Sequence, residues 1–155
     1  MTHDQPLWTP SAQAIAAAPI TAFMKRAAAV SGRRIGDFDD LHRWSIEERE
    51  AFWSLLWDEA GVIGDKGARV LVDGDRMPGA RFFPDAKLNF AENLLGKPGK
   101  GDALVFRGED KVEYRWSWAE LSDRVSQLQQ YFRAQGIKPG DRIAAMMPNM
   151  PETIA

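Results

Sequence analysis

The sequence contains no cysteine, only two histidines and no long apolar run. Without cysteine there can be no disulfide framework, thiolate nucleophile or cysteine-ligated zinc site, and a reducing cytoplasm suits the chain best. The histidines, His3 and His42, are too far apart for a metal-binding pair one helical turn apart, and we interpret His42 as structural. No window reaches the about 18 apolar residues of a membrane span, and the first residues show no signal-peptide pattern. We therefore expect a cytoplasmic protein that does not enter the membrane.

The charges are too balanced for a nucleic-acid-binding protein. The 20 Lys and Arg residues are offset by 22 Asp and Glu residues, which gives a formal net charge of -2. Neutralising phosphates requires a concentrated excess of cations, so we expect neither nucleic acid nor a membrane surface as a partner. The chain does have 155 residues, 45% of them hydrophobic, which is enough for a core of ordinary size.

The first 60 residues show helical periodicity. Ser11 predicts the cap of a short first turn, Pro19 the first residue of a new helix, and Gly32 the end of that helix. The apolar residues at helical spacing are Ile20, Phe23, Met24 and Ala27.

A second helix is predicted from Ser45 to Gly61. Ser45 and Glu48 form the S-x-x-E pattern of a capping box, and Gly61 is a typical helix stop. The apolar stripe consists of Ile46, Trp53, Leu56, Trp57 and Ala60. We interpret the three tryptophans of HRWSIEEREAFWSLLW, which are Trp44, Trp53 and Trp57, as core residues rather than a ligand box, because aromatic residues at helical spacing mostly fill cores. These residues complete a predicted helical cap.

Residues 61–101 contain glycine and proline at short intervals, and only one short strand is predicted there, at Val70–Val72. The large apolar residues of the segment are Phe82, Phe83, Leu88, Phe90, Leu94 and Leu95. Since exposing them together would create a large apolar patch, we expect this extended segment to lie against other parts of the protein. The flexible stretch GKPGKGD, residues 96–102, predicts a boundary between a region 1–100 and a region 101–155.

Region 101–155 alternates between strand and helix patterns. Two β-rich runs around the turn signal at residues 108–110 predict a hairpin. A helix follows, with a capping box of Ser117 and Glu120 and an end at Gly136. Its apolar stripe consists of Leu121, Val125, Leu128 and Phe132. Such a stripe needs a sheet beneath it.

A buried strand is predicted after this helix. Pro139 and Gly140 form a tight turn, and Ile143–Met147 is a continuous apolar run, typical of a strand buried on both faces. Pro151 and Glu152 predict the first turn of another helix. The sequence thus predicts an α/β fold in which a helical cap precedes the first hairpin, helix and strand of an α/β domain. We expect this domain to be incomplete and the chain to be the front part of a longer one.

The sequence offers no catalytic, cofactor-binding or metal-binding residue that we can assign. Gly96 and Gly101 stand at phosphate-loop spacing, but Asp102 occupies the position of the Walker lysine, where a carboxylate would repel phosphate. We interpret Asp58 and Glu59 as part of a solvated helix face rather than as a catalytic pair.

Two motifs of region 101–155 resemble those of the adenylate-forming acyl-CoA synthetases. RWSWAEL, residues 115–121, looks like the first core motif, L-[ST]-Y-x-E-L, with Trp116 and Trp118 in place of Leu and Tyr. GIKPGDRIAAMMPNMPE, residues 136–152, is similar to the element G-[VI]-x-x-G-D-R-[VI]-A-x-x-x-P-N-x-P-E of that family. The order and spacing of the motifs, with a capped helix between them, favour this family over chance.

The upstream half resembles the acetoacetyl-CoA synthetase branch of the family. The segments that carry this resemblance are PLWTPS, HRWSIEEREAFWSLLWD and MPGARFFPDAKLNFAENLL. Phe82 stands where tryptophan is common in related branches. The resemblance spans nearly the whole chain.

The resemblance implies a two-step ligation by a full-length parent, an ATP-dependent acid–thiol ligase. ATP with Mg²⁺ converts a carboxylate, here acetoacetate, into an acyl-adenylate, and CoA then displaces AMP. The family performs this chemistry with a Ser/Thr/Gly-rich phosphate loop, an adenine-binding segment, an acidic ribose ligand and a lysine on a mobile subdomain. None of these is matched within residues 1–155. We therefore expect the fragment alone to be inactive, to bind no cofactor, and to have the remainder of its own chain as its partner.

Two alternatives remain open. The parent could be another short-chain acyl-CoA synthetase, because no acyl-binding pocket is visible in this part. Alternatively, the chain could be a stand-alone interaction module that binds a partner through an uncovered sheet edge.

Overall fold

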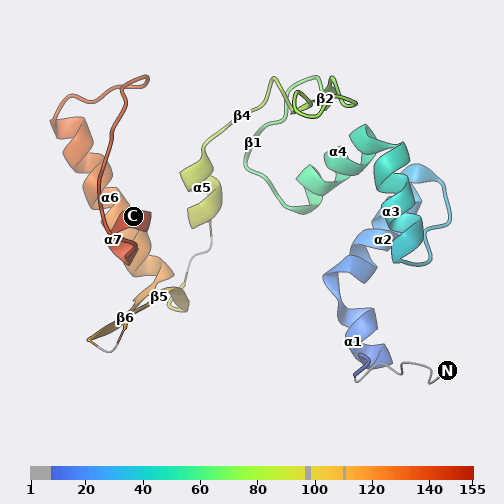
Figure 1. Cartoon of the computed structure of the whole chain (residues 1–155), viewed down its shortest axis with the longest axis horizontal. Coiled ribbons are helices and arrows are strands. Elements are labelled where there is room, and N and C mark those ends of the chain that lie inside the picture. The colour runs from blue at the N-terminus through green and yellow to red at the C-terminus, as the bar shows by residue number, and fades with distance from the viewer. Residues whose placement is uncertain (1–7, 97–98, 110) are drawn as a thin grey trace. The chain divides into compact units, whose positions relative to one another are not determined.

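The computed structural model describes residues 8–96, 99–109 and 111–155. The chain forms two compact units, Met1–Asn89 and Phe90–Ala155, and each is described by itself. Figure 1 shows their helices and strands. The sequence pattern places a domain boundary at 100/101 instead, within the stretch 96–102, of which residues 97–98 lie outside the described residues.

Over its described residues, 8–89, the first unit consists of four helices followed by short strands. Its elements are α1 (Ala12–Ala17), α2 (Pro19–Ser31), α3 (Phe38–Glu47), α4 (Arg49–Glu59), β1 (Gly64–Asp65), β2 (Leu71–Val72), β3 (Arg81–Phe82) and β4 (Lys87–Leu88). β1 pairs with β4 and β2 pairs with β3, both antiparallel. The predicted strand at Val70–Val72 corresponds to β2.

The helix signals before residue 33 are confirmed. The Ser11 hydroxyl accepts a hydrogen bond from the Ala14 N–H at 3.1 Å, which caps α1. Pro19 is the first residue of α2, and Gly32 ends that helix in the left-handed region at φ 66°. Glycine suits this position because it has no Cβ to clash there.

The predicted helix start at Ser45 is wrong. α3 begins earlier because the Asp37 carboxylate accepts a hydrogen bond from the Asp40 N–H at 2.8 Å and caps the helix. Ser45 lies inside α3, where its hydroxyl donates to the His42 carbonyl at 2.7 Å. This back-bonding lets serine sit inside a helix, so the S-x-x-E pattern alone does not mark a start. The helical conformation is interrupted between α3 and α4 at Glu48, which has φ -121° and ψ 56°.

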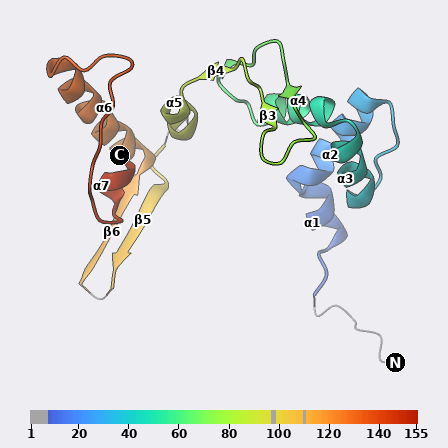
Figure 2. The same cartoon turned by 45° about the horizontal axis from the view of Figure 1, so that its top comes forward.

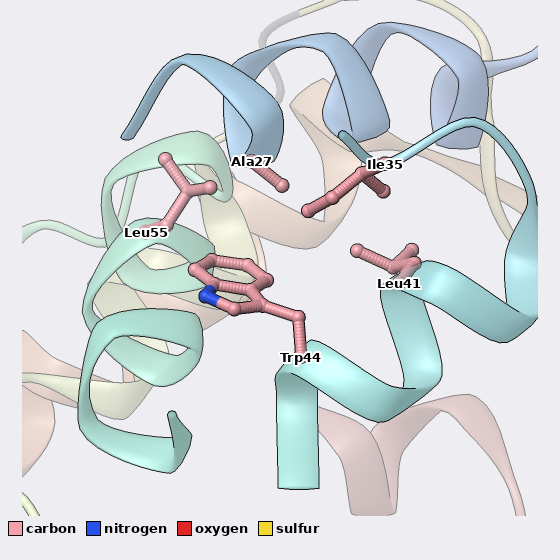
Figure 3. Packing of buried hydrophobic residues seen from close by; sticks show 5 residues of the cluster. All are labelled: Ala27, Ile35, Leu41, Trp44 and Leu55. Carbon is pink, nitrogen blue, oxygen red and sulfur yellow. The ribbon is translucent and has the colours of Figure 1, made fainter. Parts of the chain in front are cut away.

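The core of the first unit lies between α2, α3 and α4. Figure 3 shows the buried residues, which are Ala27, Ile35, Leu41, Trp44 and Leu55. Trp44 is 1% exposed, and its indole N–H donates to the Glu48 carboxylate at 3.1 Å. Interpreting the tryptophans as packing residues is therefore correct for Trp44. The predicted stripe is wrong in detail: Ile46 belongs to α3 and is 56% exposed, and the buried residue of α4 is Leu55 rather than a member of the stripe.

Part of the segment after α4 packs against that helix, as expected. The Phe82 ring lies 5.0 Å from that of Trp53, and the Phe83 ring lies 4.8 Å from that of Trp57. The Arg49 guanidinium, at the start of α4, donates to the Gly74 carbonyl at 2.7 Å. Phe82 is nevertheless 45% exposed, and other apolar residues of the segment are also exposed, contrary to expectation: Leu88, Phe90 and Leu94.

The second unit contains the predicted hairpin and its helix. Its elements are α5 (Phe90–Leu95), β5 (Asp102–Gly108), β6 (Val112–Ser117), α6 (Trp118–Ala134) and α7 (Pro151–Ile154). β5 and β6 form an antiparallel pair, although Asp110 of the predicted turn lies outside the described residues. α7 begins at Pro151, as the sequence predicts. Among the described residues, no helix is long and apolar enough to cross a membrane.

The predicted burial of the α6 stripe and of the following strand is wrong for this chain. Leu121 is 3% exposed, but Leu128, two turns further along α6, is 39% exposed. Ile143–Met147 forms no strand, and every residue from 141 to 149 is exposed. A strand requires a hydrogen-bonded neighbour and covered faces, and the described residues supply neither to this run.

Asp37→Ala is expected to lower the free energy of unfolding of the helical unit by about 1 kcal/mol, because it removes the cap of α3. Urea denaturation followed by circular dichroism measures this loss. The matched control is Ser45→Ala, which leaves the cap intact and should cost less. A larger loss of unfolding free energy for Ser45→Ala than for Asp37→Ala would indicate that the helix starts at Ser45.

Trp44→Ala is expected to lower the same free energy of unfolding by about 3 to 5 kcal/mol, because it leaves a cavity between three helices. Ile46→Ala, on the exposed side of α3, should change it by no more than about 0.5 kcal/mol. Equal effects of the two substitutions would contradict the packing of Figure 3.

Candidate functional site

The first motif of the second unit positions the start of α6. The Ser117 hydroxyl accepts from the Glu120 N–H at 3.2 Å, and the Glu120 carboxylate accepts from the Ser117 N–H at 2.8 Å. The capping box predicted from the sequence is thus confirmed. The Ser117 backbone N–H, and then its hydroxyl, hold the pKa of the Glu120 carboxyl below its ordinary value.

A side-chain contact ties α7 to the hairpin. The Tyr114 hydroxyl on β6 donates to the Glu152 carboxylate on α7, with O···O distances of 2.8 and 3.1 Å. Loss of solvent around the phenol, followed by the hydrogen bond with Glu152, raises the pKa of Tyr114. The sequence gives no sign of this contact, because the partners are 38 residues apart and Glu152 fits a helix first turn equally well.

Two short contacts shape the second motif around its apolar run. The Lys138 N–H donates to the Asp141 carboxylate at 2.8 Å, and Gly140 between them has φ 99°. The Thr153 hydroxyl donates to the Pro148 carbonyl at 2.6 Å. These contacts fix a turn before the run and a helix start after it, so the motif residues here have architectural roles.

The loop before β5 presents carbonyl groups to the start of α6. The Gly101 carbonyl accepts from the Trp118 N–H and the Gly99 carbonyl accepts from the Ala119 N–H, each at 3.1 Å. A phosphate at a helix start would need such N–H groups free. Together with Asp102, this geometry does not fit a phosphate site, in agreement with the sequence argument.

The remaining candidates take part in ordinary surface contacts. His42 stacks on Phe38, with the ring centroids 6.2 Å apart. Asp58 pairs with Lys66 and Glu59 pairs with Arg26, each at 2.6 Å. Within the part of the chain that the structure describes, no group of three or more His, Asp or Glu residues could hold a metal ion.

Two adjacent segments of the chain, one mostly in each unit, match two protein families. Residues 38–94 match the family described as "Acetyl-coenzyme A synthetase N-terminus", and residues 90–155 match "AMP-binding enzyme". Over these two segments the chain is thus similar to the class of acyl-CoA synthetases and AMP-binding enzymes.

Within this class, the chain corresponds to the amino-terminal part of acetoacetyl-CoA synthetases. The acetoacetyl-coenzyme A synthetase of Rhizobium meliloti (strain 1021) is 57% identical over 155 residues, which are 100% of this chain and 24% of the relative. The solved structure "Acetoacetyl-CoA Synthetase from Streptomyces lividans" matches with a TM-score of 0.77 and 40% identity, over 97% of this chain and 24% of that chain.

A third relative carries a different substrate in its name. The malonamoyl-CoA synthetase of Penicillium aethiopicum is 32% identical over 83% of this chain and 19% of the relative. The chain therefore spans about a quarter or less of the length of these relatives.

Acidification is expected to loosen the first turn of α6. Because the folded-state pKa of Glu120 is lowered, its contribution is complete above its unfolded pKa and is lost as the pH falls through the folded value. At pH values below about 4, the Ser117 amide should thus be less protected from hydrogen exchange than at neutral pH. Glu120→Gln should already be less protected at neutral pH and show a weaker pH dependence. An identical acid response of both proteins would assign the effect to another group.

Proposed function

We propose that this chain is the amino-terminal part of an acetoacetate–CoA ligase. The parent would convert acetoacetate, ATP and CoA into acetoacetyl-CoA, AMP and pyrophosphate through an acyl-adenylate. The observation that carries this proposal is the 57% identity over the whole chain to a relative named as an acetoacetyl-coenzyme A synthetase. The match to the AMP-binding enzymes supports the use of ATP and CoA. Mg²⁺ would screen the phosphates of ATP in the parent, and a cytoplasmic location would give access to ATP and CoA.

The role proposed for these 155 residues is structural. The start of α6 does not fit a phosphate site, since Asp102 is acidic and the Trp118 and Ala119 N–H groups donate to the Gly101 and Gly99 carbonyls. The carboxylate of acetoacetate and the phosphates of ATP would be bound by parts of the family fold that this chain does not match. We therefore expect no ligation by the 155-residue chain alone.

A second candidate function is the ligation of another short acyl acid. The similarity to a malonamoyl-CoA synthetase favours keeping it, because that relative shares this region while its name specifies another acyl group. We therefore expect the region described here not to discriminate among acyl groups. The stand-alone interaction module remains the alternative from another class.

The test is a chimera in which this chain replaces the matching first quarter of the Rhizobium meliloti relative. We expect ATP–pyrophosphate exchange that depends on acetoacetate, with acetate and malonamate as comparison substrates. The controls are the relative without its first quarter and the 155-residue chain alone, both of which should be inactive. A folded chimera without exchange, or exchange by the chain alone, would contradict the proposal.

The chimera reports on the compatibility of this chain with the ligase. The acyl preference of the parent itself is measured by substrate profiling of the full-length protein. Preference for an acid other than acetoacetate would favour the second candidate.

A further inference from the structure

The turn between β2 and β3 contains the only Asp-Gly sequence of the chain, Asp73-Gly74, and the chain has no Asn-Gly sequence. In Figure 2 the segment that leads into β3 passes beside α4. The Arg76 N–H donates to the Asp73 carbonyl at 2.9 Å, which closes a turn over residues 73–76. Asp73 is exposed and has φ 56°, in the left-handed region that aspartate tolerates better than most residues. The dipeptide therefore lies at the surface, in a tight turn.

An Asp-Gly sequence can rearrange without an enzyme. The Gly74 nitrogen attacks the side-chain carboxyl carbon of Asp73, an N–C bond forms, and the carboxyl hydroxyl leaves as water with the proton of the Gly74 N–H. The resulting succinimide ring then takes up one water at either of its two carbonyl groups. Opening at one carbonyl restores aspartate, and opening at the other gives isoaspartate, in which the main chain runs through Cβ. Glycine favours the attack because it places no side chain beside the nitrogen.

The two reacting groups are held loosely, whereas the carbonyl next to them is held tightly. Among the described residues, the Gly74 N–H donates no hydrogen bond. The Asp73 carboxylate faces Arg81 with an N···O distance of 3.6 Å, which is longer than a hydrogen bond. The Arg49 guanidinium, by contrast, donates to the Gly74 carbonyl and to the Asp75 carboxylate, each at 2.7 Å. Arg49 thus ties the turn to the start of α4 through the residue that would react.

The product of the rearrangement does not fit these contacts. A Cβ at Gly74 would lie 2.7 Å from a methyl carbon of Leu71 and 3.3 Å from the Nη1 atom of Arg49, so the backbone is closely surrounded at this point. Isoaspartate lengthens the main chain before Gly74 by one carbon atom. The Gly74 carbonyl would then be displaced from Arg49, and the turn would lose a contact that ties it to α4.

We infer that Asp73-Gly74 is a site of spontaneous conversion of aspartate to isoaspartate, and that Arg49 sets the rate of this conversion. Ring closure brings the Gly74 nitrogen into bonding distance of the Asp73 side chain and therefore shifts Gly74. The hydrogen bond from Arg49 to the Gly74 carbonyl opposes that shift. The only other reactant is water, so the modification is independent of the proposed ligase function.

Ageing of the 155-residue chain in oxygen-18 water at neutral pH tests the inference. Trypsin, used afterwards in ordinary water, releases residues 70–76, VLVDGDR, which contain both Asp73 and Asp75. Opening of the succinimide ring inserts one oxygen-18 atom, and electron-transfer fragmentation distinguishes isoaspartate from aspartate at each position. We expect oxygen-18 and isoaspartate to accumulate at Asp73. Asp75 is the internal control and should stay unlabelled, because the side chain of Arg76 follows it.

A matched pair of substitutions measures the role of Arg49. Arg49→Met removes the donor to the Gly74 carbonyl, while Arg107→Met removes an exposed arginine that pairs with Glu113 on the hairpin. Circular dichroism should show unchanged helicity for both variants. Isoaspartate at Asp73 should form several-fold faster in Arg49→Met and at an unchanged rate in Arg107→Met. Unfolding the unsubstituted chain in urea, which releases every contact of the turn, should also raise the rate.

Each outcome decides one part of the inference. Absence of oxygen-18 at Asp73 after ageing, or equal labelling of Asp73 and Asp75, would overturn the site itself. Equal rates in Arg49→Met and in the unsubstituted chain would overturn the role of Arg49. Because these measurements use no acyl substrate, ATP or CoA, a failed inference leaves the ligase proposal untouched, and an inactive chimera leaves this inference untouched.

Discussion

An apolar strand is stable only when its backbone groups are hydrogen bonded and its faces are covered, and the second unit of this chain does not meet that requirement within its described residues. Ile143–Met147 is anchored at both ends but has no neighbouring strand. The α6 stripe is likewise covered only in part, since only its first residue, Leu121, is buried. The hairpin, the capping box and the Tyr114–Glu152 contact therefore position an apolar surface that the described residues leave partly exposed.

The first unit differs because it contains a buried apolar cluster, which consists of Ala27, Ile35, Leu41, Trp44 and Leu55. Trp44 is enclosed by α2, α3 and α4, and the Phe82 and Phe83 rings extend the packing across the outer face of α4. Arg33, just after α2, also pairs with Glu47 and Glu48 at 2.6 Å, near the break between α3 and α4. The helical unit thus has a core of its own, whereas the second unit presents an unfinished one. This difference supports a role for the second unit as the start of a larger α/β domain.

Local signals made several elements predictable from the sequence. Helix ends could be predicted where each depends on a few neighbouring residues, as for the caps at Ser11 and Ser117 and the stop at Gly32. The start of α3 was missed because Asp37 and Ser45 offer competing caps, and only tertiary packing shows that Ser45 is inside the helix. The strand at Ile143–Met147 was predicted from a pattern that assumes a complete sheet. For the site, Asp102 argues from sequence against a phosphate loop at residues 96–102. The Tyr114–Glu152 contact could not be predicted, because it depends on a fold that brings distant residues together.

The proposed ligase requires that these residues begin a longer acyl-CoA synthetase rather than form a self-contained module. The measurement to make is the sequence of the coding DNA beyond the codon for Ala155. If the proposal is correct, the open reading frame continues into a Ser/Thr/Gly-rich phosphate loop and, much later, a lysine-bearing carboxy-terminal subdomain. A stop codon directly after Ala155 in the natural gene would exclude the ligase, and the exposed apolar run Ile143–Met147 would then have to be covered by a separate protein.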